Sequence, residues 1–409
     1  MTHTYEITKG RDTELLQHVE KFNGKPMKVC FLLRSLNYGG AEQQLVLLAK
    51  GLHERGHQVV VMTFYSGGPL EMKLLEAGVR IRPLHKRGRW DVLAFLFRLV
   101  LIMREERPDI LHSYLTDQNL VAILLKPLFH SGRIVWGVRC SIKDFGRREW
   151  LDGVSFKLTC WLSRFADAII ANSHAGSAHH VAMGYPAKKT VVIHNGIDTE
   201  PYHCDPKARE RIRLEWGVTE HEELIGVVAR LDPVKDHPTF LKAAALLSDK
   251  RRTSRFVCVG QGPAKYREEL DSLAKNLGLG ERLLWVGNHE DMPAVYNALD
   301  ISVSSSLSEG LPNVIGEAMA CGVPCVVTNV GDSAWVVGDM GEVVPRKNSV
   351  ALADAIQRLL NRKTYDPAQI RRRIVDELSV NSLVTNTEHV LSALLKGSAS
   401  NEMVNLSKH

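Results

Sequence analysis

The sequence predicts an α/β protein made of two doubly wound domains that face a central cleft. Short apolar runs alternate with helix-like segments along most of the chain, which is typical of parallel sheets. A turn-rich stretch at residues 195–206 interrupts this alternation once, and the pattern then starts again. The length of 409 residues is also more typical of two domains than of one.

The first domain is expected at residues 27–197. Its strand candidates are short apolar runs at residues 27–33, 58–64, 110–112, 134–138, 168–171 and 191–193. Helix-like segments, such as residues 41–52 and 91–106, separate most of these runs. Strands that alternate with helices indicate a parallel sheet with right-handed crossovers.

The second domain is expected at residues 198–378, where the same pattern returns. The strand candidates are residues 224–229, 256–259, 283–286, 301–303 and 325–328, with helices at 238–247, 266–277 and 292–298. Residues 1–26 form an N-terminal extension. We expect a C-terminal helix at residues 379–396 that packs back on the first domain, and a tail at 397–409.

Composition excludes several classes of protein. A hydrophobic fraction of 44% with 24% charged residues is typical of a folded domain and argues against disorder. Seven cysteines without framework spacing favour a reducing cytoplasm. The polar N-terminus lacks a signal-peptide core, and the longest apolar segment, residues 92–103, contains Arg98 and is too short to span a bilayer. The basic residues are dispersed, so no nucleic-acid partner is expected.

Charge is unevenly divided between the two halves. Residues 1–198 carry 27 basic and 18 acidic side chains, whereas residues 199–409 carry 25 and 28. This split predicts that the two domains meet different partners.

The segment between Ser304 and Pro324 has the densest set of candidate functional residues. A strand is expected to end in a serine-rich turn that contains Glu309, and a helix then begins near Asn313. The N–H groups at a helix start suit phosphate, and the flanking carboxylates of Glu309 and Glu317 suit hydroxyl groups. A polyol attached to a diphosphate would satisfy every one of these features. The alternative is that Glu309 is a surface charge and Glu317 a partner of the helix dipole.

With its two glutamates separated by seven residues, Glu309 and Glu317, the sequence resembles the retaining glycosyltransferases of family 4, which have the GT-B fold. Three further segments carry the resemblance: Gly39-Gly40-Ala41-Glu42, Asn195-Gly196-Ile197-Asp198 and residues 228–236. It runs from about Lys28 to Ala393. It implies two Rossmann-like domains around a cleft, with residues 27–197 binding the acceptor and residues 198–378 binding the nucleotide-sugar donor.

Arg230 and Lys235 follow the first strand of the second domain. Two cations at a strand end can neutralise a diphosphate leaving group without a metal ion. The resemblance assigns them this role, and the sequence has no Asp-X-Asp motif, so we expect no metal and no cofactor. The alternative is a solvated basic turn.

The resemblance also places other residues in the cleft. It implies that Glu309 contacts the transferred sugar and that Glu317 binds the ribose. The remaining residues that it puts beside the nucleotide, phosphates or sugar are Gly39, Gly40, Gly262, Asn288, Leu311, Pro312, Asn313 and Val314. Without the resemblance, Gly39 and Gly40 would be interpreted as part of an ordinary loop.

One position departs from the family pattern. Many members have a histidine near the reacting carbon, after the strand that corresponds to residues 134–138, where this chain has Arg139. Arginine stays protonated and cannot act as a base, but it can bind phosphate or an anionic acceptor. A structural ion pair is the alternative. His112, at the end of the preceding strand, is a candidate at the cleft edge or a core histidine. The Trp-Gly-Val-Arg run at residues 136–139 is similar to members that assemble surface polysaccharides.

His53 and His57 match the spacing of a zinc-protease motif, His-Glu-X-X-His. Gly56 is expected to end the helix before His57, so the two imidazoles would not share a helical face. We therefore predict no zinc site at this segment.

These observations predict a retaining, metal-independent transfer from a nucleotide diphosphate sugar, with UDP favoured, to a hydroxyl of a lipid-linked glycan. The apolar segment at residues 90–103 follows Lys86, Arg87 and Arg89, and residues 147–150 add a second basic and aromatic patch. We expect peripheral contact with an anionic membrane on its cytoplasmic face; a core helix is the alternative. Two other functions remain open: a soluble transferase acting on a small metabolite, and a non-catalytic protein that binds sugar nucleotides.

Overall fold

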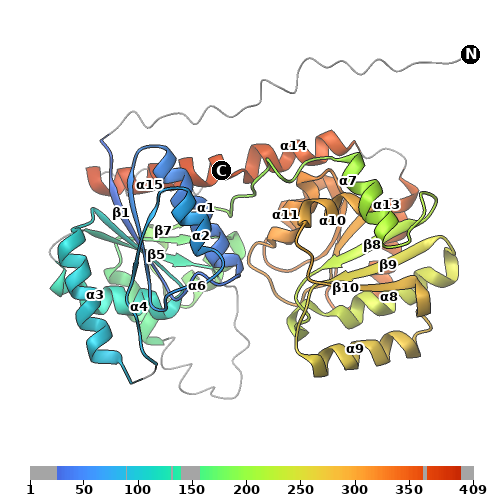
Figure 1. Cartoon of the computed structure of the whole chain (residues 1–409), viewed down its shortest axis with the longest axis horizontal. Coiled ribbons are helices and arrows are strands. Elements are labelled where there is room, and N and C mark those ends of the chain that lie inside the picture. Colours follow the sequence, from blue (N-terminus) through green and yellow to red (C-terminus); the bar gives the residue numbers. More distant parts are fainter. Residues whose placement is uncertain (1–24, 89, 130–131, 140–156, 363–365, 398–409) are drawn as a thin grey trace, which may run out of the picture.

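The computed structural model describes residues 25–88, 90–129, 132–139, 157–362 and 366–397. Figure 1 shows two α/β units side by side, each built on its own parallel sheet. The N-terminal extension up to residue 24, Arg89, the patch at 147–150 and the tail from residue 398 lie outside the described residues. In the described part of the chain, no helix is both long and apolar enough to cross a bilayer.

The first unit contains a seven-stranded parallel sheet in the order β3-β2-β1-β4-β5-β6-β7. Its strands are β1 (Lys28–Leu33), β2 (Gln58–Thr63), β3 (Arg80–Pro83), β4 (Ile110–Tyr114), β5 (Arg133–Val138), β6 (Ala168–Ala171) and β7 (Thr190–Val192). Helices α1 (Gly40–Glu54), α2 (Glu71–Glu76), α3 (Val92–Glu106), α4 (Thr116–Leu125) and α6 (His174–Ala182) accompany them. Both faces of the sheet are buried, because alternate residues of β1 enter opposite cores: Phe31 joins one and Leu32 the other.

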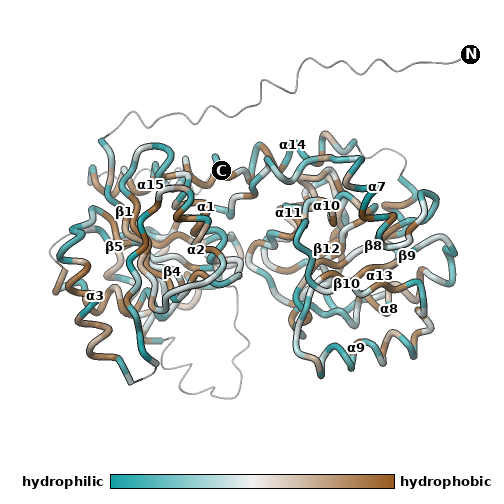
Figure 2. The backbone as a smooth tube through the Cα atoms, viewed as in Figure 1, coloured by the Kyte–Doolittle hydropathy of each residue, from teal (hydrophilic) through white to brown (hydrophobic). Residues whose placement is uncertain are grey.

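The second unit has a six-stranded parallel sheet in the order β10-β9-β8-β11-β12-β13. The strands are β8 (Glu223–Val228), β9 (Ser254–Val259), β10 (Leu283–Gly287), β11 (Ile301–Ser304), β12 (Cys325–Thr328) and β13 (Gly341–Val344). The helices are α7 (Pro206–Glu215), α8 (His237–Lys250), α9 (Ala264–Asn276), α10 (Met292–Ala298), α11 (Asn313–Ala320), α12 (Ser333–Val337), α13 (Ser349–Asn361) and α14 (Pro367–Leu378). Figure 2 shows apolar positions gathered along the strands inside each unit.

These two doubly wound sheets confirm the α/β architecture predicted from the sequence. Strands β3 and β13, each at one edge of its sheet, were not predicted from the sequence. Both are only partly buried, and both interrupt apolar residues with charged or small ones, so neither has the apolar run that marks a central strand.

The chain crosses between the units twice, and the two crossings lie against each other. Ile197 donates its N–H to the carbonyl of Leu378 and accepts from the N–H of Val380. The last helix, α15 (Val380–Lys396), then returns to the first unit, where Leu383 and Leu391 join the core beneath α1. The two segments at residues 195–198 and 378–380 therefore form a paired connection between the units.

A buried charged cluster fixes α15 against the end of α1. Glu388 accepts from Nη1 of Arg55 at 2.9 Å and from Nε2 of His57 at 2.6 Å, and all three side chains are nearly inaccessible to solvent. The other ring nitrogen of His57 accepts from the N–H of Met27. Because α1 ends at Glu54, His57 does not share its helical face with His53, which agrees with the rejection of a zinc motif here.

Candidate active site

The order of strands reverses between β1 and β4 in the first sheet and between β8 and β11 in the second. Open parallel sheets bind ligands beyond the carboxyl ends of the strands at such switch points. Gly39 and Gly40 follow β1, Arg230 and Lys235 follow β8, and Glu309 follows β11. The topology therefore brings candidate residues from separate parts of the sequence to the switch points of the two sheets.

Two helix N-termini, one from each unit, meet across the cleft. Gly40 is the first residue of α1 and Asn313 the first residue of α11. A Cβ atom added to Gly40 would lie 3.8 Å from Nδ2 of Asn313. Within the described ranges, neither helix start is capped by a side chain. Because uncapped N–H groups and the helix dipole both favour negative charge, this is a suitable place for an anion. Leu311 and Pro312, just before α11, are buried.

Lys235 and Glu309 form an ion pair beside this point. Nζ of Lys235 lies 2.6 Å from Oε1 of Glu309, which also accepts from the hydroxyl of Ser306 at 2.6 Å. Both charged side chains are mostly buried. Arg230 is different: its side chain is 78% exposed, and among the described residues its ion-pair partner is Asp232, at a distance of 3.6 Å. The structure therefore joins Lys235 to Glu309 but leaves Arg230 facing solvent.

Glu317 lies in the second turn of α11 and accepts from the hydroxyl of Tyr296 at 2.7 Å. Burial raises the pKa of Glu317 above its ordinary value, although the hydroxyl of Tyr296 acts in the opposite direction. Glu317 is thus more readily protonated than an exposed glutamate.

A side-chain hydrogen bond links the loop after β9 to the loop after β10. Nδ2 of Asn288 donates to Oε1 of Gln261 at 3.3 Å. A Cβ atom on Gly262 would lie 2.2 Å from the carbonyl oxygen of Leu231, so only glycine permits this close approach of two loops. The family resemblance implies that Gly262 and Asn288 lie beside the nucleotide, and the geometry adds a packing reason for the glycine.

Arg139 is linked through hydrogen bonds to the start of α11. Its Nη1 donates to Oδ1 of Asn195 at 2.9 Å, and Nδ2 of Asn195 donates to Oδ1 of Asn313 at 2.8 Å. Its Nη2 donates to the hydroxyl of Tyr114 at 2.7 Å. No carboxylate lies within 4.0 Å of the guanidinium among the residues that the structure describes. Asn195 is a contact residue that the sequence offered only as part of a family motif.

His112 is fully buried, and neither of its ring nitrogens has a hydrogen-bond partner in the described part of the chain. It packs between Phe31 and Tyr114, with ring centroids 5.5 and 4.8 Å away. Burial, with a smaller effect of the Arg139 charge, holds the pKa of His112 well below its ordinary value. His112 is therefore protonated less readily than an exposed histidine, and its ring packs against Phe31 and Tyr114.

A second contact between the units was not predicted from the sequence. Asp332, just before α12, accepts from the N–H groups of His174 and Ala175 at 2.6 and 2.9 Å. His194 lies 3.3 Å from the same carboxylate and stacks on Trp335 with ring centroids 4.0 Å apart. Burial acts to raise the pKa of Asp332, but the hydrogen bonds from His194 and the two backbone amides outweigh it and lower the pKa. No local sequence pattern marks this group, because its members lie up to 158 residues apart.

Two families of known proteins match this chain, one in each half. The family described as Glycosyltransferase Family 4 matches residues 38–201, and the family described as Glycosyl transferases group 1 matches residues 222–362. The chain is a glycosyltransferase with one domain of each family. The first matched region contains β2 to β7, and the second contains all six strands of its sheet, so both halves of the glycosyltransferase are recognisable.

Two curated bacterial relatives extend over most of this glycosyltransferase. A Campylobacter jejuni enzyme is 27% identical over 90% of this chain and 98% of its own length; it is named as an alpha-1,4-N-acetyl-D-galactosaminyltransferase of a diNAcBac-PP-undecaprenol glycan. The N-acetyl-alpha-D-glucosaminyl L-malate synthase of Bacillus anthracis is 25% identical over 85% of this chain and 92% of its own. The relatives therefore include enzymes with very different acceptors.

Solved glycosyltransferases share the GT-B fold. Anabaena Alr3699/HepE in complex with UDP-glucose superposes with a TM-score of 0.78 at 25% identity and covers 90% of this chain and 100% of its own. A glycosyltransferase from Rickettsia africae gives a TM-score of 0.80 at 19% identity over 92% of this chain and 100% of its own. These likenesses confirm two Rossmann-like domains arranged around a cleft.

Proposed function

We propose that this glycosyltransferase transfers a sugar with retention from a nucleotide diphosphate sugar, UDP-linked in preference to others, to a hydroxyl of a lipid-linked glycan. The observation that carries the proposal is the meeting of two uncapped helix starts, at Gly40 and Asn313, from opposite domains. A diphosphate seated there would receive N–H groups from both domains only when the cleft is closed.

On the donor side, Lys235 would bind a phosphate oxygen of the leaving group. Its present partner, Glu309, would then turn to a hydroxyl of the transferred sugar, because a carboxylate accepts where a hydroxyl donates. Glu317 would accept from the ribose hydroxyls in exchange for the hydroxyl of Tyr296. Arg230, which is exposed, would reach the diphosphate by a change of rotamer.

The reaction proceeds from one face of the sugar. The acceptor oxygen forms a bond to the anomeric carbon while the bond from that carbon to the β-phosphate oxygen breaks. The departing phosphate takes the proton of the acceptor hydroxyl, so the products are a nucleoside diphosphate and a glycoside of unchanged anomeric configuration. Lys235 and the N–H groups at Gly40 and Asn313 stabilise the growing phosphate charge, and this needs no metal ion.

The choice of UDP is supported by the solved structure of Anabaena Alr3699/HepE in complex with UDP-glucose. The choice of a lipid-linked acceptor is supported by the Campylobacter jejuni relative, whose named substrate carries a PP-undecaprenol group. Arg139 offers a cation without a carboxylate partner in the described residues, which suits the diphosphate of such an acceptor.

The outer face of α3 supplies the second argument for a lipid-linked acceptor. Leu93 and Phe97 are 83% and 64% exposed, whereas Phe95 and Leu99, on the opposite side of the helix, are buried in the core. One side of α3 therefore packs in the core and the other side is an exposed apolar surface. Both interpretations of this segment, a core helix and a helix that contacts a membrane, are compatible with this arrangement. Exposed Arg87 precedes it, and basic residues beside an apolar helix suit an anionic membrane. Figure 2 shows the apolar character of α3.

The test begins with a thermal-shift panel of nucleotide sugars, followed by transfer to membranes or lipid-linked glycans. A stabilising donor should give nucleoside diphosphate release that depends on lipid acceptor, and NMR of the product should show the anomeric configuration of the donor. Full activity should persist with EDTA. An inverted product, or release that occurs equally without acceptor, would contradict the proposal.

A transferase acting on a small metabolite is a second candidate, because the Bacillus anthracis relative is named as an N-acetyl-alpha-D-glucosaminyl L-malate synthase, and malate is a small hydroxy acid. It predicts transfer in the absence of lipid. Comparing extracted lipids with a panel of soluble hydroxy acids and inositol phosphates as acceptors separates the two functions.

A further inference from the structure

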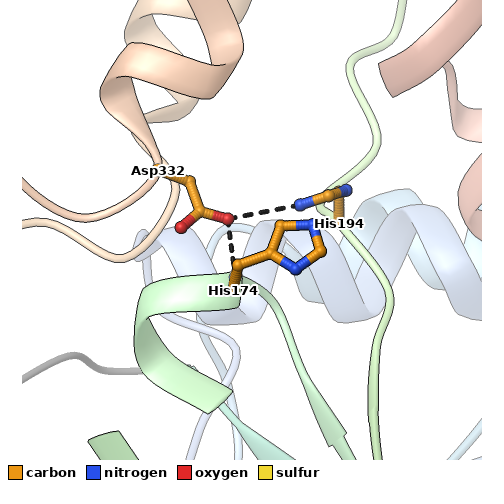
Figure 3. A group of neighbouring side chains, drawn as sticks. All are labelled: His174, His194 and Asp332. Atoms are coloured by element: carbon orange, nitrogen blue, oxygen red, sulfur yellow. Dashed lines mark hydrogen bonds and ion pairs between the residues drawn. The ribbon is translucent and has the colours of Figure 1, made fainter. Parts of the chain in front are cut away.

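A group of side chains at the second contact between the domains has the chemistry of a metal site. His174, His194 and Asp332 each offer one donor atom, and these atoms lie within 4.8 Å of one another. Figure 3 shows the two imidazoles beside the carboxylate. His174 begins α6, His194 follows β7, and Asp332 precedes α12, so two donors come from the first domain and one from the second.

The surroundings hold two of the three donors in place. The backbone amides of His174 and Ala175 orient the carboxylate of Asp332, and the Trp335 ring stacks within 20° of the His194 ring. Such contacts beyond the ligands orient them and tune metal affinity. His174 is exposed, so its ring is free to rotate toward the other two donors.

We propose that His174, His194 and Asp332 bind one divalent transition-metal ion of the zinc type, and that the bound ion ties the two domains together. Two imidazoles and a carboxylate suit Zn²⁺, Cu²⁺ or Ni²⁺ better than Mg²⁺ or Ca²⁺, which prefer oxygen donors. Bonds of about 2.0–2.2 Å require the donors to draw closer than they lie now, which rotation of His174 allows. Water completes the coordination.

Because the ligands come from both domains, the ion binds the closed arrangement more tightly than an open one. By linkage it therefore favours closure and slows the opening that releases product. The site uses none of the residues assigned to the donor, so metal binding here is a regulatory property and is separate from the chemistry of transfer.

The experiment titrates the full-length protein, freed of metal by a chelator and carrying no histidine tag, with Zn²⁺ against a chromophoric competitor. Co²⁺ provides a second probe, because its visible absorption reports imidazole and carboxylate ligation. The variants are His174→Ala, His194→Ala and Asp332→Asn. His179→Ala, on the same helix as His174, is the matched control.

We expect one equivalent of Zn²⁺ in the parent protein and in His179→Ala, and at least about tenfold weaker binding in each of the three site variants. Because the His174 side chain is exposed, its replacement should leave the fold intact, which a thermal melt checks. Equal affinity in His174→Ala and the parent would show adventitious binding to other histidines and overturn the proposal, as would the absence of binding.

Small-angle scattering tests the tie between the domains. Zn²⁺ should reduce the radius of gyration of the parent protein and leave that of His174→Ala unchanged. An unchanged radius of gyration in the parent protein at saturating Zn²⁺ would overturn the proposal that the ion ties the two domains together. These measurements use no nucleotide sugar, so their failure and a failure of the proposed transfer reaction are distinguishable.

Discussion

The two domains place cations at the cleft in different ways. In the second domain, Lys235 is balanced by Glu309 at 2.6 Å. In the first domain, Arg139 is held by the neutral oxygens of Asn195 and Tyr114, with no carboxylate partner in the described ranges. Because Lys235 is already paired with a carboxylate, it can exchange this partner for a phosphate with little change in the net charge of the site. The positive charge of Arg139 is not balanced in this way, so it remains available to an incoming anion. This contrast favours binding of the donor diphosphate by the second domain and binding of an anionic acceptor by the first domain.

Replacing Lys235 tests the donor side of this comparison, and it should lower the activity more than any other substitution proposed below. In Lys235→Ala, the leaving phosphate loses its nearest buried cation, and we expect kcat to fall by about 10²- to 10³-fold. Initial rates of nucleoside diphosphate release measure the loss. The matched control is Lys242→Ala, an exposed lysine of α8, which should retain the parent rate. Similar rates in both variants would remove Lys235 from the mechanism.

Replacing Arg139 should affect the acceptor more than the donor. Loss of its charged hydrogen bonds in Arg139→Ala should raise KM for a lipid diphosphate acceptor by about tenfold or more, with donor affinity little changed. Arg139→Lys keeps the charge but loses the forked contact to Asn195 and Tyr114, so it should recover only part of the affinity. A change confined to the KM of the donor would instead show that Arg139 contributes to donor binding and not to acceptor binding.

The raised pKa of Glu317 predicts a pH dependence of donor binding. In the proposed function, ribose hydroxyls would donate to the ionised carboxylate. A raised pKa means that protonation removes this acceptor at a higher pH than in an ordinary glutamate. The dissociation constant for a nucleotide sugar should therefore increase as pH falls from neutral toward the ordinary glutamate range. Calorimetry across this range measures it. In Glu317→Gln the dependence should flatten; an unaltered profile would assign the titration to another group.

The smallest expected effect concerns the outer face of the first domain. Leu93→Ser with Phe97→Ser should reduce cosedimentation with anionic liposomes, because each removes exposed apolar area from α3. Leu214→Ser, which replaces an equally exposed leucine of the second domain, should bind liposomes as the parent does. Equal loss in both proteins, or none in either, would argue against docking through α3.

Much of the candidate site could be predicted because its parts lie close together in the sequence. Glu309, Asn313 and Glu317 belong to one loop and helix, so their order along the chain already implied a phosphate site flanked by carboxylates. The strand before Lys235, β8, could also be predicted, because it is a buried apolar run. The exposure of Arg230, by contrast, depends on side-chain packing that the sequence pattern does not contain.

By itself, the sequence determined the two α/β domains, because short continuous apolar runs and the helix-like segments between them reflect burial within each local element. Only the tertiary structure decided which distant residues meet. Asn195 reaches Asn313 across 118 residues, and Asp332 reaches His174 across 158. Such contacts depend on how two separately folded domains face each other, and no local periodicity records that arrangement. The candidate anion site at the two helix starts and the group of His174, His194 and Asp332 both depend on that arrangement.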